Sequence, residues 1–179
     1  MLTKSIDFKN FKIKKNTKKI KNNLKLLLKE NNEILKSLGK RYKNSFDKKI
    51  VNKYKASYNY RIIGMGGSTL GTQAIYGFLR GKIKKKFSFI DDLQFKKKIN
   101  NKKKYTNIIV SKSGNTIETI INANILIKKK DTNIFITENK KNYLHLLAEK
   151  LKTDIIHHNN FIGGRYSVLS EVGMLPAEL

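Results

Sequence analysis

The stretch YTNIIVSKSGNTIETIINANILIKKK, residues 105–130, joins a short apolar run to an amphipathic run through a turn that is rich in hydroxyl groups. The apolar run at 105–110 has the length and the β-branched composition of a buried strand. In residues 116–130, apolar side chains recur at the spacing of one helix face. This stretch therefore predicts a strand, a turn and a helix, in that order.

The same order recurs on both sides of this stretch, with short connections between the elements. Further strands are predicted at 60–65, 86–91, 132–137 and 153–158, and further helices at 69–81, 92–100 and 141–151. Strands that alternate with helices in this way indicate a parallel sheet with helices on both faces. We therefore predict an α/β domain over residues 60–179, built on a mainly parallel five-stranded sheet.

Residues 1–59 form a basic N-terminal segment, in which apolar side chains follow a helical spacing over residues 20–38. Asn16 or Thr17 can cap the start of this helix, and Gly39 can stop it. We predict that this segment is helical and that the apolar face of its helix packs on the main domain.

The composition is strongly basic, with Lys+Arg 39 against Asp+Glu 13 and a formal net charge of +26. Such an excess is typical of nucleic-acid-binding proteins. Arginine is the residue best suited to bidentate phosphate contacts, but it occurs only as Arg41, Arg61, Arg80 and Arg165. The lysines are spread along the chain together with asparagine and isoleucine, as an AT-rich genome favours. We therefore interpret the charge as compositional drift and expect no specific nucleic-acid partner.

Cysteine and hydropathy narrow the class of protein further. The sequence contains no cysteine, so it offers neither a disulfide scaffold nor a thiolate metal site. No apolar run approaches the roughly 20 residues of a membrane-spanning helix, and the first residues lack the apolar centre of a secretory signal. We expect a cytoplasmic protein that does not associate with membranes.

The first of three polar loops is GMGGSTLG, residues 64–71, which follows the predicted strand at 60–65. Its glycines allow positive φ angles and the close approach of a ligand to the backbone. Their spacing differs from the dinucleotide-binding G-x-G-x-x-G, and the loop lacks the lysine of a P-loop, so neither kind of site is indicated. A ligand-binding loop and a turn that serves packing alone are equal alternatives here.

The second loop is SKSGNT, residues 111–116, at the junction of a strand and a helix. Free backbone amides and the positive end of the helix dipole attract anions at such a junction. Gly114 lets the backbone wrap a ligand, Lys112 adds charge, and hydroxyl donors come from Ser111, Ser113 and Thr116. The alternative is an ordinary N-cap, but a cap needs one hydroxyl and this loop has three. We therefore favour a phosphate-binding loop.

The third loop is GGR, residues 163–165, which follows the predicted strand at 153–158. Its glycines bring the backbone close to a neighbour, and arginine in a lysine-rich chain favours a role for the planar guanidinium. A structural ion pair is the alternative for Arg165. His157 and His158 are adjacent on a predicted strand, so they face opposite ways and cannot bind one metal ion together. We expect ordinary packing or polar contacts for both histidines, and no metal site.

Together, the three loops resemble the glucose-6-phosphate isomerase family, whose members are built from sugar isomerase (SIS) domains. GMGGSTLG is similar to the first glycine-rich segment of the family, SKSGNTIET to its phosphate-binding loop, and GGRYSVLSEVGMLP to its signature. The resemblance covers about residues 60–179. It implies a three-layer SIS-type domain, preceded by a helical N-terminal segment.

The resemblance also implies an activity and residue roles. The family interconverts glucose 6-phosphate and fructose 6-phosphate in glycolysis and gluconeogenesis, through an enediolate and without a metal or cofactor. By this resemblance Arg165 is a catalytic residue that stabilises the negative charge of the enediolate. The matching substrate-binding residues are Gly67, Ser68, Ser111, Lys112, Ser113, Thr116 and Gly164.

In the family, the glutamate base, a ring-opening histidine and a further lysine lie beyond this signature. Glu171 and Glu178 are the carboxylates nearest to the signature here, and neither matches the base. The resemblance therefore implies the N-terminal part of an isomerase that is a homodimer at full length and inactive in this short form. The alternatives are a non-catalytic SIS module that senses a sugar phosphate and, on charge alone, a nucleic-acid-binding protein.

Overall fold

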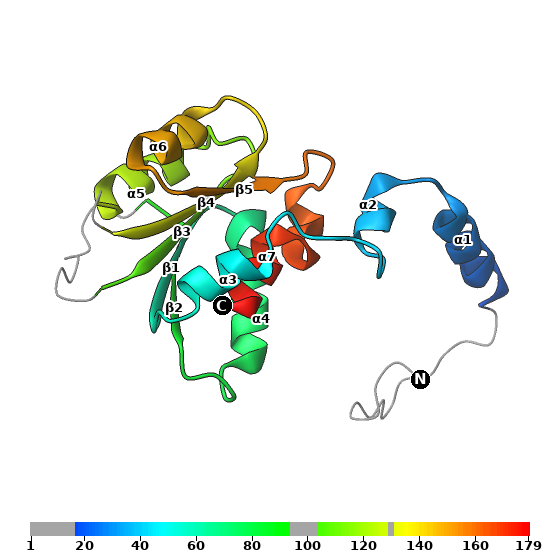
Figure 1. The fold of residues 1–179 in the computed structure, drawn as a ribbon. Helices are drawn as coiled ribbons and strands as arrows, with labels where there is room; N and C mark the ends of the chain where they lie inside the picture. Colours follow the sequence, from blue (N-terminus) through cyan, green and yellow to red (C-terminus); the bar gives the residue numbers. More distant parts are fainter. Residues whose placement is uncertain (1–16, 94–103, 129–130) are drawn as a thin grey trace.

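The computed structural model describes residues 17–93, 104–128 and 131–179. Within these ranges lie the strands β1 (Asn59–Ile63), β2 (Lys86–Ile90), β3 (Thr106–Val110), β4 (Thr132–Glu138) and β5 (Asp154–His158). They form one sheet in the order β2-β1-β3-β4-β5, in which every neighbouring pair is parallel (Figure 1). The predicted five-stranded α/β fold is thus confirmed.

The helices of the domain are α4 (Gly67–Leu79), α5 (Ile117–Leu126), α6 (Tyr143–Leu151), α7 (Glu171–Glu178) and the 3₁₀ helix η1 (Gly164–Leu169). Three of them, α4, α5 and α6, lie where the sequence predicted helices, whereas η1 and α7 were not predicted. The helix predicted at 92–100 falls almost entirely on residues 94–103, outside the described residues. None of the helices within the described ranges has the length and apolar content needed to cross a lipid bilayer.

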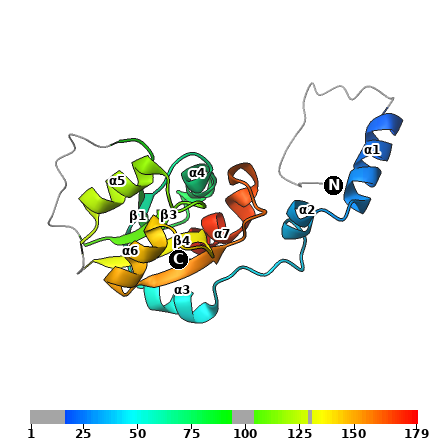
Figure 2. The same ribbon diagram turned by 90° about the horizontal axis from the view of Figure 1, so that it is seen from above.

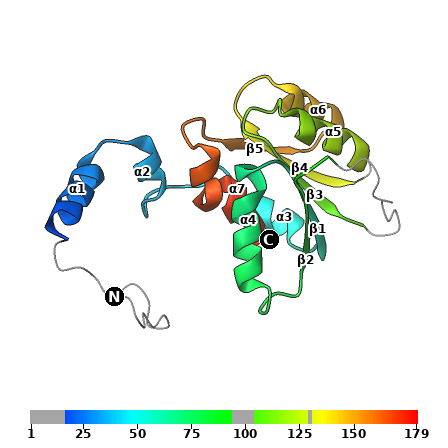
Figure 3. The same cartoon turned by 180° about the vertical axis from the view of Figure 1, so that it is seen from behind.

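The central strands β3 and β4 are buried on both faces, which explains why they read as nearly continuous apolar runs. Side chains alternate along each strand, so Ile108 and Val110 of β3 face one hydrophobic cluster and Ile109 faces the other. The first cluster includes Val172 and Leu175 of α7, and the second includes side chains of α5 and α6. Figure 3 shows α5 and α6 on one side of the sheet and α3, α4 and α7 on the other.

The N-terminal segment differs from the single helix that the spacing predicted. It contains α1 (Lys18–Lys29), α2 (Glu33–Ser37) and α3 (Lys48–Tyr54), with Thr17 at the N-cap position of α1 as predicted. The break has a local cause. The side chain of Asn32 accepts a hydrogen bond of 2.8 Å from the amide of Ile34, which starts a new helix there.

The prediction that the apolar face of the N-terminal helix packs on the main domain is wrong for α1. No residue of α1 is buried, and both α1 and α2 stand away from the sheet (Figures 1 and 2). α3 packs on the domain instead, through Ile50, Val51 and Tyr54. Since α3 and α7 cover one face of the sheet, and α5 and α6 cover the other, neither face is left for α1.

Candidate functional site

The three predicted loops lie around the point where the strand order of the sheet reverses, between β1 and β3. From β1 the chain crosses to β2 at one edge, whereas from β3 it continues to β4 and β5 on the other side. The two chain segments that follow β1 and β3 therefore diverge, with α4 on one face of the sheet and α5 on the other (Figure 3). Open parallel sheets bind ligands at such a point, beyond the carboxyl ends of the strands.

The first loop touches the strand that leads into the second. A Cβ atom added to Gly64 would lie 2.7 Å from the carbonyl oxygen of Val110, the last residue of β3. Gly66 has a φ angle of +52°, and Gly67 then begins α4, with Ser68 half-buried beside it. Among the described residues, no atom lies within 4 Å of a Cβ built on Gly66. Gly64 therefore serves packing, whereas the turn after it is open.

The second loop is held by the end of β4 and by Asn142, which follows that strand. The carbonyl oxygen of Lys112 accepts hydrogen bonds from the amide of Glu138 at 3.0 Å and from the hydroxyl of Thr137 at 3.2 Å. Gly114 has a φ angle of +66°, and a Cβ atom there would overlap the side chain of Asn142. The backbone of this loop is therefore fixed by contacts within the protein.

The polar side chains of the second loop do not cap α5. The hydroxyl oxygens of Ser111 and Thr116 lie 2.9 Å apart, and that of Ser113 accepts from the amide of Asn115 at 3.3 Å. The side-chain oxygen of Asn115 accepts from the amide of Tyr143 at 3.0 Å. In the described part of the chain, no side chain of this loop accepts from the first-turn amides of α5. These amides and the positive end of the helix dipole thus stay open, and the N-cap alternative is not what forms.

The third loop begins at the edge strand β5 and returns to α4. A Cβ atom on Gly67 would overlap the carbonyl oxygen of Gly164, so the two backbones are in direct contact. The hydroxyl of Ser167 donates to the carbonyl oxygens of Gly67 at 3.1 Å and of Gly164 at 2.8 Å. A Cβ atom on Gly71 would lie 2.9 Å from the Cβ of Val168. These contacts bring the first and third loops together.

Arg165 is exposed at the start of η1 and lines an open hollow of about 620 Å³. The rest of this hollow is lined by Gly67, Leu70, Gly71, Gly163, Gly164, Tyr166 and Val168. No residue in the described ranges forms a hydrogen bond or an ion pair with the guanidinium of Arg165. The structural ion pair considered for Arg165 is therefore not found, and its guanidinium is available to an anion.

The two histidines face opposite ways, as predicted, since His157 is exposed and His158 is buried. The Nδ1 atom of His158 lies 3.2 Å from the Oε2 atom of Glu171, which is fully buried. Burial raises the pKa of Glu171, but hydrogen bonds from His158, Tyr42 and Ser45 outweigh burial and hold the pKa below its ordinary value. Glu171 is thus an enclosed carboxylate, and it is not free to act as a base on a substrate.

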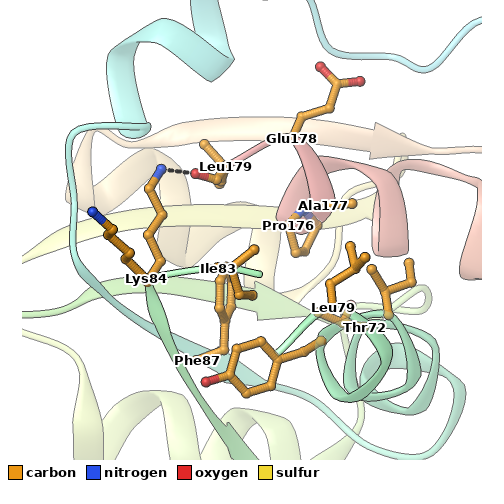
Figure 4. Close-up of a pocket in the computed structure, with 12 residues that line it drawn as sticks. Thr72, Leu79, Ile83, Lys84, Phe87, Pro176, Ala177, Glu178 and Leu179 are labelled. Atoms are coloured by element: carbon orange, nitrogen blue, oxygen red, sulfur yellow. Dashed lines mark hydrogen bonds between the residues drawn. The ribbon is translucent and has the colours of Figure 1, made fainter. Parts of the chain in front are cut away.

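A separate cavity of about 340 Å³ lies between α4, β2 and the end of α7 (Figure 4). Most of its lining side chains are apolar, including Ile75, Leu79, Ile83, Phe87 and Pro176. Beside it, the ammonium group of Lys85 donates a hydrogen bond to the carbonyl oxygen of Leu179. This cavity does not gather the hydroxyls and helix amides that a phosphate group needs. Across the described residues, no three His, Asp or Glu side chains are grouped as a metal site requires.

The sequence and fold match known proteins. The phosphoglucose isomerase profile matches residues 15–179. The glucose-6-phosphate isomerase of Methanocaldococcus jannaschii is 36% identical over 141 residues, which are 70% of this chain and 34% of that protein. The chain therefore spans about a third of the length of this relative.

Two solved structures share the fold. A protein of Thermus thermophilus described as hypothetical has a TM-score of 0.60 and 24% identity, over 73% of this chain and 34% of that one. The tagatose-6-phosphate ketose/aldose isomerase of Escherichia coli has a TM-score of 0.54 and 17% identity, over 68% of this chain and 38% of that one. At these identities both structures show the fold alone, whereas the profile match covers more than nine-tenths of the chain. The chain belongs to the phosphoglucose isomerase family.

Proposed function

We propose that this chain forms the phosphate-binding part of a glucose-6-phosphate isomerase. One observation carries the proposal: loops that follow three different strands meet at one end of the sheet. Gly64 packs on the end of β3, and Gly67 packs on Gly164 from beyond β5. Membership of the family supports the same function. In this proposal residues 60–179 are the SIS domain and residues 1–59 are its helical lead-in.

The phosphate group of the sugar would bind at the second loop. Ser113 and Thr116 would donate hydroxyl hydrogen bonds to phosphate oxygens, and the open amides at the start of α5 would add further donors. Ser111 is buried and its hydroxyl lies 2.9 Å from that of Thr116, so Ser111 would support Thr116 from behind. Lys112 would contribute positive charge from the same loop. Because this backbone is already fixed by its neighbours, little conformational entropy would be lost on binding.

The reacting end of the sugar would lie toward the third loop. Gly67 and Ser68 would line the cleft between the phosphate and the reacting carbons, and Gly164 would let the backbone approach them. The reaction moves a proton from C2 to C1 through an enediolate. The unpaired guanidinium of Arg165 would stabilise the negative charge that develops on the enediolate oxygens.

Turnover tests this proposal, because binding alone does not move the proton. A base must lie within about 3 Å of the C2 hydrogen, and Glu171 is already enclosed by its own partners. We expect a protein of these 179 residues to bind fructose 6-phosphate without isomerising it. Completing it with the remaining sequence of the Methanocaldococcus jannaschii relative should restore activity.

In the completed protein, Arg165→Ala should lower kcat by about 100-fold or more, as expected when a preorganised charge is lost. The matched control is Arg80→Ala, because Arg80 is also exposed but lies at the far end of α4. Equal activity of both variants would contradict the role of Arg165. Robust turnover by the 179-residue protein would contradict the proposal that the catalytic base is not among these residues.

The alternative is a non-catalytic domain that binds a sugar phosphate. The absence of a carboxylate that matches the family's base favours it, and Glu171, which follows the third loop closely, is enclosed by its own partners. A completed protein that binds fructose 6-phosphate but never isomerises it would support this alternative. The isomerase proposal also includes a homodimer and a cytoplasmic location.

A further inference from the structure

A short piece of the N-terminal segment is anchored to a buried carboxylate near the candidate site. The hydroxyl of Tyr42 donates to the Oε1 atom of Glu171 at 2.7 Å. The amide and the hydroxyl of Ser45 both donate to the same oxygen at 3.1 Å. The side-chain amide of Asn159 in turn donates to the hydroxyl oxygen of Tyr42 at 3.0 Å. This segment showed no motif in the sequence, yet it satisfies a fully buried charge.

The other oxygen of Glu171 faces His158, whose two ring nitrogens lie near two different oxygens. The Nε2 atom of His158 lies 3.2 Å from the carbonyl oxygen of Ile162. The Nδ1 atom lies 3.2 Å from the Oε2 atom of Glu171. His158 therefore bridges the side chain of Glu171 and the backbone at Ile162.

These contacts hold both ends of the segment that carries Arg165. His158 and Asn159 lie where β5 ends, Ile162 comes just before the glycines, and Glu171 follows η1. His158 therefore connects the chain before the turn, at Ile162, with the chain after it, at Glu171. Between these two points, Arg165 has no partner of its own in the described chain, so the backbone alone sets the position of its guanidinium.

We propose that Glu171, His158 and Tyr42 are positioning residues, which fix the turn at residues 163–165 against α4 so that Arg165 faces the reacting carbons. This inference rests on the proposed function. Errors of about 1 Å in the placement of a catalytic group can cost on the order of 100-fold in rate, so a rigid support for Arg165 matters. The N-terminal segment would then be part of the site, although it touches no substrate.

The chain offers a matched control at the opposite end of β5. There the hydroxyl of Tyr54 donates to the carboxylate of Asp154, which also pairs with Lys53 at 2.7 Å. Tyr54, like Tyr42, belongs to the N-terminal segment and holds a carboxylate of the main domain. Asp154 begins β5, at the amino end of the strands, whereas the candidate site lies at their carboxyl ends.

The test compares Tyr42→Phe with Tyr54→Phe, each of which removes one hydroxyl. Calorimetry would measure the affinity of each variant for fructose 6-phosphate and for inorganic phosphate. We expect Tyr42→Phe to weaken fructose 6-phosphate binding about 3- to 10-fold, the loss of roughly one hydrogen bond, and to leave phosphate binding within about twofold. Tyr54→Phe should leave both affinities within about twofold. Glu171→Gln should weaken fructose 6-phosphate binding more than Tyr42→Phe does.

Amide hydrogen exchange provides a readout that is independent of any ligand. Exchange over residues 159–170 should become faster in Tyr42→Phe and should not change in Tyr54→Phe. Equal ligand affinities and equal exchange in the two variants would overturn the positioning role and leave the proposed function intact. A parallel loss of both ligands in Tyr42→Phe would also overturn it, because general destabilisation would explain that result. A wild-type protein that binds neither ligand would overturn the proposed function, and the positioning role with it.

Discussion

Two consecutive strand–turn–helix units, β3–α5 and β4–α6, are built alike but end their turns differently. Their strands are neighbours with paired residues in register, and α5 and α6 cover the same face of the sheet. At the start of α6, the side chain of Asn142 accepts from the amide of His145 at 2.9 Å, which closes the helix end. At the start of α5, the hydroxyl of Thr116 pairs with Ser111 instead.

In our proposal, this difference separates a turn that stabilises the fold from a turn that binds the phosphate group. A cap such as that of Asn142 satisfies an amide that would otherwise need water. The first turn of α5 lacks such a cap, although its loop has hydroxyl groups within reach. The unused donors at α5 are the physical basis for assigning the phosphate to β3–α5 rather than to β4–α6.

The largest expected effect comes from removing the hydroxyls of the open turn. Ser113→Ala combined with Thr116→Ala should weaken the binding of fructose 6-phosphate by roughly 2–4 kcal/mol, because charge-assisted hydrogen bonds contribute about 1.5–3 kcal/mol each. Calorimetry measures this loss. Thr153→Ala is the control, since its hydroxyl donates to Ala148 near the far end of α6. Unchanged affinity in the double variant would mean that the loop does not bind phosphate.

A smaller effect, which involves both turns, is expected where Gly114 of the first turn packs against Asn142 of the second. Gly114→Ala would force a side chain into a positive φ angle and onto Asn142, so the free energy of unfolding should fall by about 1–3 kcal/mol. Phosphate affinity should fall as well, because the loop must shift. Gly77→Ala is the matched control, as its Cβ would meet nothing within 4 Å among the described residues. Equal free energies of unfolding for the two variants in chemical denaturation would show that the contact between Gly114 and Asn142 does not constrain the two turns.

The smallest effect is expected from removing the Asn142 cap at the start of α6. Asn142→Ala should lower the free energy of unfolding by about 0.5–2 kcal/mol through the loss of the α6 cap, and it should cost less phosphate affinity than the double variant. Asn142→Asp keeps an acceptor for the His145 amide but loses the donor that bonds Thr137 and Lys140, so it should recover only part of the stability. If Asn142→Ala weakened phosphate binding as much as the double variant, the contrast between the two turns would fail.

The sheet could be predicted from the sequence because its signals are local. Runs such as NIIV in β3 and NIFIT in β4 contain the apolar residues of both faces, and glycine and polar residues mark where each strand stops. The N-terminal segment was harder, since the cap at Asn32 competes with a stripe that continues at helical spacing. The stripe predicted one long helix with a packed face, whereas the structure divides the segment into shorter helices and buries no residue of α1.

The candidate site could be predicted in part, for a similar reason. Each of its three loops carries a local pattern, and the rule for parallel sheets places them at the same end. The contacts of Glu171 could not be predicted, because Tyr42 and Ser45 are 129 and 126 residues away in sequence. Nothing in the residues around Tyr42 signals a buried partner. Only the fold brings that segment beside the loop of Arg165.

Amide chemical shifts test the central claim, that the β3–α5 turn binds the phosphate of a sugar phosphate, most directly. A ¹⁵N-labelled protein would be titrated with fructose 6-phosphate and followed by two-dimensional NMR. We predict large shifts for the amides of residues 113–119, where the loop meets the open end of α5, and little change at residues 143–146, where α6 is capped. Shifts of equal size at both helix starts, or none at residues 113–119, would contradict the account.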